Sequence, residues 1–64
     1  MKLFSKVRLI TNKYDSDGAK KNSIGIVLEV YATGDYEVQF LDKNGEPSDI
    51  FFSVHPDEIE SFDN

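Results

Sequence analysis

The chain has 64 residues, of which 39% are hydrophobic and 30% are charged, and its formal net charge is −5 at pH 7. This length allows a single domain over residues 1–64, and the absence of cysteine excludes disulfides and thiolate metal sites. No apolar run approaches the roughly 20 residues that cross a bilayer, and residues 1–6 lack the apolar run of a signal peptide, so we expect a cytoplasmic protein without a membrane partner.

Charge is distributed unevenly along the chain. Six basic and two acidic residues leave residues 1–21 with a net charge of +4, whereas one basic and ten acidic residues leave residues 22–64 with −9. A largely acidic surface disfavours nucleic-acid binding, which needs a basic face to neutralise phosphates. It suits a basic protein partner, because complementary charge speeds encounter. The alternative is that the charge serves only solubility.

The first predicted strand covers residues 6–10, where polar and apolar residues alternate, and this alternation places Val7 and Leu9 inward. Residues 12–23 follow as a polar stretch without periodicity, which predicts a long loop. Loops of this length are often functional. The alternative is an ordinary connection that folds back over one end of the domain.

The strongest pattern lies in residues 23–41, where two β-type segments, 25–31 and 36–41, flank a short turn and predict a hairpin. Gly25 at the start of the first segment is typical of a bulge or a close backbone approach. Alternation along both segments predicts one apolar inner face. Its expected members are Ile26, Leu28 and Val30, paired with Tyr36, Val38 and Phe40.

The remaining elements are short. An Asn-Gly pair within residues 42–47 supplies positive φ angles for a second tight turn. Residues 49–54 are predicted as a fourth strand, residues 56–59 as a single helical turn, and residues 60–62 as a short fifth strand. No segment has a helical period, so the fold class we predict is all-β: a small SH3-like antiparallel barrel of four to five strands with one helical turn before the last strand.

The segments that carry this prediction are residues 6–9, 25–31, 34–40 and 42–46, with the pattern G-x-V-x-E-V followed by Y-x-V-x-F. Over residues 6–60 this pattern resembles a family of short bacterial SH3-like or KOW-like domains of unknown function. Genes of that family are often found beside toxin genes. The resemblance therefore implies an immunity or antitoxin role.

No set of residues predicts an enzyme. His55 is the only histidine, so any catalytic triad would have to include it. Ser53 and Asp57 lie close to it in sequence, but closeness in sequence does not produce the geometry of a triad. The Asp-Ser-Asp-Gly run at residues 15–18 is similar to the start of a calcium loop. An EF-hand loop that began at residue 15 would need glycine at its sixth position and a bidentate acid at its twelfth, but this chain has Lys20 and Ile26 there. We therefore expect no metal and no cofactor.

One alternative is a KOW-like module associated with nucleic acid or the ribosome. It would use a basic patch near Tyr14, formed by Lys6, Arg8, Lys13, Lys20 and Lys21. The ten acidic residues in the rest of the chain would repel phosphate, so we disfavour this reading.

The leading hypothesis is a small acidic protein-binding module. We expect an immunity or antitoxin protein that neutralises a bacterial toxin by occluding its active or substrate-binding surface, with a basic domain such as a nuclease as its partner. The expected contact residues are those that point outward from the central hairpin and the fourth strand. They are Glu29, Tyr31, Asp35, Glu37, Gln39, Asp49 and Phe51, with Tyr31 and Phe51 as aromatic anchors.

Two further readings stay open. The chain could be a small regulatory or assembly subunit of a larger complex, which the genes beside its own would indicate. Three apolar residues in succession, Ile50, Phe51 and Phe52, leave at least one aromatic side chain on the outer face unless a loop covers it. A bare outer face of this kind would also be compatible with a homodimer.

Overall fold

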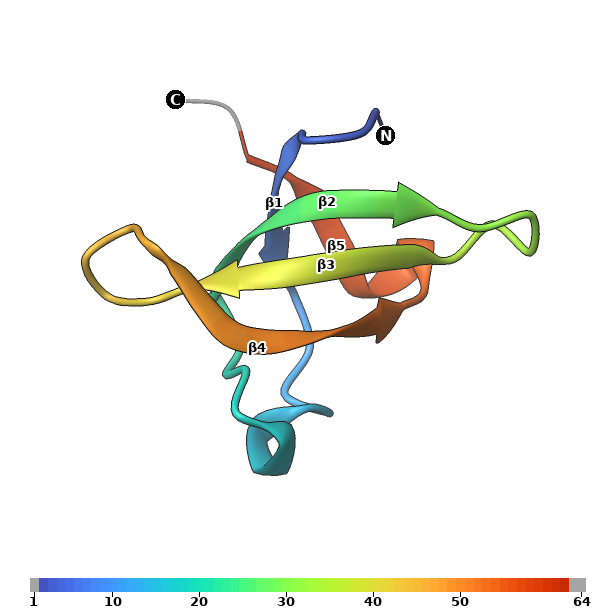
Figure 1. Ribbon diagram of the computed structural model, residues 1–64. Helices are drawn as coiled ribbons and strands as arrows, with labels where there is room; N and C mark the ends of the chain where they lie inside the picture. The colour runs from blue at the N-terminus through green and yellow to red at the C-terminus, as the bar shows by residue number, and fades with distance from the viewer. Residues whose placement is uncertain (1, 63–64) are drawn as a thin grey trace.

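Residues 2–62 are described by the computed structural model, which shows an all-β chain with two short 3₁₀ turns (Figure 1). The predicted all-β class is therefore confirmed. The strands are β1 (Lys6–Leu9), β2 (Ile24–Val30), β3 (Tyr36–Leu41), β4 (Pro47–Val54) and β5 (Ile59–Ser61), and the turns are η1 (Asp15–Asp17) and η2 (Pro56–Glu58). In this part of the chain no helix is long and apolar enough to cross a membrane.

The five strands form one antiparallel sheet in the order β4-β3-β2-β1-β5. β4 and β5 are its two edges, and no ladder between them closes the sheet within residues 2–62. Figure 1 shows β1 and β5 running across the direction of β2, β3 and β4, so the sheet is strongly bent. Two register shifts, between Val27 and Glu29 and between Gln39 and Leu41, mark bulges, which increase local twist and bending.

The core lies on the concave side of this bent sheet. Val7 and Leu9 are fully buried, as the alternation in β1 predicts. Four partly buried side chains, Tyr14, Tyr36, Ile50 and Phe52, pack against the buried cluster. The cluster consists of Val7, Leu9, Ala19, Val27, Val38, Phe40, Val54 and Ile59.

The predicted inner face of β2 is wrong. Val27, which was expected to point outward, is fully buried opposite Val38, while Ile26 and Leu28 are only half-buried. The reason is Gly25, which takes the inner position opposite Phe40 without adding a side chain. The bulge after Val27 then changes the phase of the strand, so that Val30 lies opposite Tyr36 as predicted, but Val30 is 43% exposed and does not join the core.

The connection between β1 and β2 is better ordered than its composition predicts. It contains the η1 turn, where the Tyr14 carbonyl accepts hydrogen bonds from the N–H groups of Asp17 (2.9 Å) and Ala19 (3.3 Å). Ala19 is 1% exposed and belongs to the core. The loop is thus anchored beneath the sheet, in agreement with a connection that folds over one end of the domain.

The C-terminal half follows the prediction with small shifts. β4 begins at Pro47, two residues earlier than expected, β5 covers Ile59–Ser61 instead of residues 60–62, and η2 occupies the predicted helical turn. In the turn between β3 and β4 only Gly45 has a positive φ (81°). The Asp42 carboxylate stabilises this turn by accepting hydrogen bonds from the N–H groups of Asn44 (2.9 Å) and Glu46 (3.0 Å).

Candidate functional site

The candidate site is the convex side of the sheet, which we call the outer face. Because Val38 and Phe40 are buried, Glu37 and Gln39 between them point away from the core, and their cross-strand partners share that side. Asp49 joins the face because it lies two residues from Phe51 on β4. The outer face consists of Lys6, Ile26, Glu29, Glu37, Gln39, Asp49, Phe51 and Ser53.

Glu37 is a hydrogen-bonded carboxylate of the outer face. Its Oε1 atom accepts hydrogen bonds from the Tyr31 hydroxyl at 3.0 Å and from the Ser53 hydroxyl at 3.1 Å. The bond to Glu37 is the main reason why the pKa of Tyr31 lies above its ordinary value. Tyr31 is therefore held beside Glu37 while 41% of its surface stays exposed.

Glu29 lies directly opposite Glu37 in the antiparallel pair of β2 and β3. Side chains at such positions have Cβ atoms about 5 Å apart, and like charges placed there destabilise a sheet. Among the described residues, no ion pair involves Glu29, Glu37 or Asp49. The outer face thus carries negative charge that its own cations do not neutralise.

Beside this charge lies an exposed aromatic side chain. Phe51 is 58% exposed and lies opposite Gln39 on β3. Gln39 is fixed by a hydrogen bond from its side-chain amide to the Ser48 carbonyl at 3.0 Å. The outer face thus combines carboxylates, an amide and one exposed aromatic side chain.

Asp35 is the one predicted contact residue that the structure places elsewhere. Its carboxylate Oδ1 lies 2.7 Å from Nδ1 of His55, at the end of the sheet where β3 begins and β4 ends. The other six predicted residues are brought together: five belong to the outer face and Tyr31 contacts it through Glu37. Their role in binding remains a prediction.

The Asp35–His55 contact predicts a pH dependence. The hydrogen bond that His55 donates to the Asp35 carboxylate, together with the charge of that carboxylate, raises the pKa of His55 above 6.5. A histidine with a raised folded-state pKa stabilises the fold below its unfolded pKa, and this contribution is lost as the pH rises through the folded pKa. We expect Asp35→Asn to lower the pKa of His55, measured from its imidazole NMR shifts, whereas Glu46→Gln in the distant turn leaves it unchanged. If the pKa of His55 were the same in Asp35→Asn as in the wild type, the contact with Asp35 would not be the cause of its raised pKa.

A second polar cluster, which the sequence pattern does not predict, lies on the core side. Glu58 is only 8% exposed, and its carboxylate accepts hydrogen bonds from the Tyr14 hydroxyl (2.6 Å), from Lys13 Nζ (3.1 Å) and from the His55 N–H (2.8 Å). Burial by itself would raise the pKa of Glu58, but these hydrogen bonds lower it below 4.5. Burial and the same contact raise the pKa of Tyr14 to about 12. The sequence feature that could have indicated this cluster is the position of Glu58, an acid three residues after His55 at the start of a helical turn, which is typical of a capping box.

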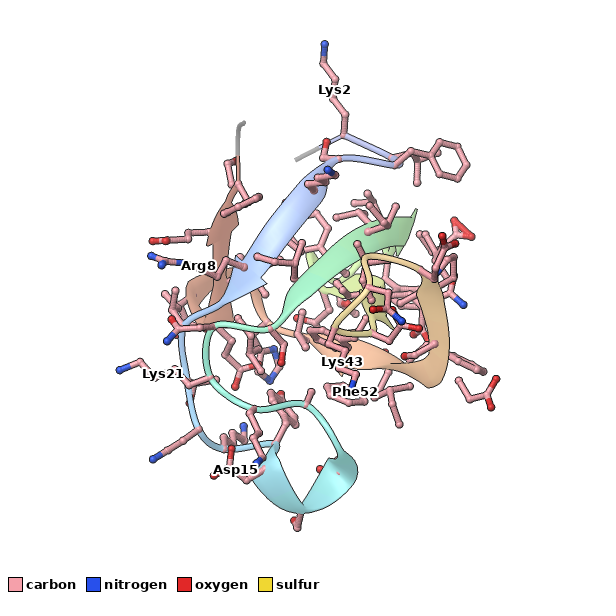
Figure 2. All side chains as sticks on the ribbon, turned by 90° about the vertical axis from the view of Figure 1, so that its left-hand side faces the viewer. Lys2, Arg8, Asp15, Lys21, Lys43 and Phe52 are labelled. Atoms are coloured by element: carbon pink, nitrogen blue, oxygen red, sulfur yellow. The ribbon has the colours of Figure 1, made fainter. Side chains whose placement is uncertain are left out.

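Two of the five residues of the predicted basic patch near Tyr14 are paired with carboxylates. Arg8 pairs with Glu60 across β1 and β5, and Lys13 pairs with Glu58. The Tyr14 ring packs against Phe52 with ring centroids 4.7 Å apart. Figure 2 shows Arg8 and Lys21 well separated along one side of the molecule, both pointing outward.

No cluster of three or more potential metal ligands occurs in residues 2–62, and no pocket opens in this part of the chain. The Asp-Ser-Asp run that is similar to a calcium loop forms the η1 turn, which Gly18 ends with a φ of 97°. Comparisons of the chain with protein-family models, with curated proteins and with solved structures give no match.

Proposed function

We propose that this protein is a small acidic protein-binding module of the SH3-like type that acts as an immunity or antitoxin protein. The strand order, with β1 between β2 and β5 and a 3₁₀ turn before β5, supports an SH3-like barrel as the finer description of the fold. The resemblance to short bacterial SH3-like or KOW-like domains encoded beside toxin genes supports the biological role.

The observation that carries the proposal is the combination of charge and exposure on the outer face. Glu29 and Glu37 lie opposite each other, no cation within residues 2–62 forms an ion pair with either, and Phe51 is exposed beside them. A basic partner would relieve the repulsion between the two carboxylates and bury the aromatic ring. A nuclease toxin meets this requirement, because its substrate cleft is basic and carboxylates placed there compete with phosphates.

The experiment is co-expression with the product of the neighbouring gene, followed by pull-down and a growth assay. We expect the two proteins to co-purify and the growth arrest caused by the neighbour to be relieved. Binding without relief would favour an assembly subunit, and neither binding nor relief would contradict the immunity function.

Charge reversal tests the contact face. Each of Glu29→Lys and Asp49→Lys should weaken binding of the basic partner roughly fivefold at low salt, which corresponds to about 1 kcal/mol for an exposed charge. Both variants should also reduce the salt dependence of the dissociation constant. Asp15→Lys is the matched control, because Asp15 is exposed in the η1 turn and outside the outer face. Equal losses in all three variants would indicate a general charge effect and not this face.

A further inference from the structure

β4 is an edge strand of eight residues, whereas β5 at the other edge has only three. Figure 1 shows β4 along one rim of the sheet. An edge strand presents backbone N–H and C=O groups that have no partner in the sheet. The direction of these groups in β4 decides whether another strand could pair with it.

The hydrogen bond from the Tyr31 N–H to the Asp35 carbonyl (2.9 Å) fixes this direction. Hydrogen-bonded and non-hydrogen-bonded pairs alternate along an antiparallel ladder, so the peptide groups of Glu37 face β2 and those of Val38 face β4. In β4, Phe52 therefore bonds to β3. The N–H and C=O groups of Phe51 and Ser53 point to the open edge.

The local contacts agree with this assignment. The Ile50 N–H, which by the same alternation points toward β3, is bonded to the Ser48 hydroxyl at 3.1 Å. No hydrogen bond of the described residues outside the strand ladders involves the backbone of Phe51 or Ser53. Both residues are also exposed.

The first half of this edge is protected and the second half is not. Pro47 and Asp49 are residues of the kind that prevent strands from pairing edge to edge. Residues 50–54, by contrast, contain no charge and no proline and are rich in aromatic and β-branched side chains. An exposed edge of this composition is suited to pairing with another strand.

We infer that residues 50–54 of β4 receive an extended segment of the protein partner, which adds to the sheet as a sixth strand next to the outer face. This inference rests on the proposed function for the existence of that partner. The segment that fits is one in which basic and apolar residues alternate, because side chains on its outer side would lie beside Asp49 and Phe51 of β4, with Glu37 one strand further in.

A second copy of this chain fits less well. Each copy has a net charge of −5, and pairing of two β4 strands would bring Asp49 of one copy to the outer face that holds Glu37 of the other. Like charges at such neighbouring positions oppose association. A cationic segment has the opposite effect and neutralises this face.

Amide hydrogen exchange followed by NMR at low salt tests the inference, with an eight-residue peptide of alternating lysine and valine, capped at both ends, as the probe. In the free protein the Phe51 and Ser53 N–H groups should exchange rapidly. Saturation with the peptide should slow both by about tenfold or more, while Phe52 and Val54, already bonded to β3, change little. The same peptide methylated on alternate backbone nitrogens should give no protection.

Two results would overturn the inference. One is no protection of Phe51 and Ser53 at saturating peptide. The other is protection without peptide that increases with protein concentration, because a second copy would then occupy the edge.

A pair of variants separates the test of strand addition from the test of the proposed function. Ser53→Pro removes one outward N–H, and Ser53→Ala removes only the hydroxyl. If the neighbouring gene product binds both variants equally but loses affinity for Glu29→Lys, strand addition is wrong and the immunity function stands. If that product does not bind at all, the peptide experiment still decides the strand addition.

Discussion

Replacing Glu58, which is only 8% exposed, with alanine should destabilise the fold by about 3 kcal/mol, because it leaves the Tyr14 hydroxyl and the His55 N–H without their acceptor. A domain of this size is stabilised by roughly 3–10 kcal/mol, so the variant should lose between about a third and nearly all of its stability. Urea unfolding at pH 7, followed by circular dichroism, measures the loss.

The same carboxylate predicts a loss of stability in acid. Its folded-state pKa is lowered from 4.5, so its contribution is fully present above that pH and disappears as the pH falls through the folded pKa. Glu58→Gln keeps the shape and removes the titration. The difference in unfolding free energy between wild type and Glu58→Gln should therefore shrink between pH 6 and pH 3.

Two controls accompany this prediction. Tyr14→Phe removes one of the three hydrogen bonds and should lose about 1 kcal/mol. Asp57→Asn changes the exposed neighbour in the same turn and should stay within about 0.5 kcal/mol of wild type. If Glu58→Ala were no less stable than Asp57→Asn, the buried carboxylate would not be what holds the β1–β2 connection to η2.

The β3 strand could be predicted from the sequence because its alternation is regular, and Val38 and Phe40 are buried as expected. Which residues of β2 point inward could not be predicted in this way. A rule of alternation counts every residue, but Gly25 occupies an inner position with no side chain and the bulge after Val27 adds one residue to the strand. Both features depend on the partner strand, which a single segment does not contain.

The β1–β2 connection shows a different limit. Its composition is that of a loop, and only tertiary packing explains why Ala19 is buried and why Tyr14 contacts Phe52. Glu58 was missed for the same reason, since its two side-chain donors are 44 and 45 residues away in sequence. Contacts at such separation leave no local pattern.

The candidate site was predictable to the extent that it follows alternation. Glu37 and Gln39 point outward because their neighbours point inward, and Phe51 does so for the same reason on β4. Asp35 precedes β3, where alternation no longer applies, and its pairing with His55 depends on how β3 and β4 are aligned. The direction of the backbone groups at the β4 edge requires the register of the whole sheet.

The close approach at Gly25 gives the second large prediction. A Cβ atom at this position would lie 2.4 Å from Cγ1 of Val38 and 3.0 Å from the Gln39 carbonyl oxygen, whereas carbon atoms in contact are about 3.5–4.0 Å apart. Gly25 is therefore required for space and not for a positive φ. We expect Gly25→Ala to lower the unfolding free energy by about 2 kcal/mol through overpacking, measured by urea unfolding.

A double-mutant cycle identifies the cause. Val38→Ala alone should destabilise by about 2 kcal/mol, because it leaves a cavity in the core, but it also removes the Cγ1 atom that the new methyl group would meet. Gly25→Ala should therefore lower the unfolding free energy of the Val38→Ala variant by about 1 kcal/mol less than it lowers that of the wild type. Val54→Ala is the matched control, since Val54 is equally buried but lies opposite Tyr36 at the other end of β3 and should show no coupling. Equal coupling with Val38 and Val54 would mean that Gly25→Ala loosens the whole sheet, and the bend at β2 would then need an explanation other than this contact.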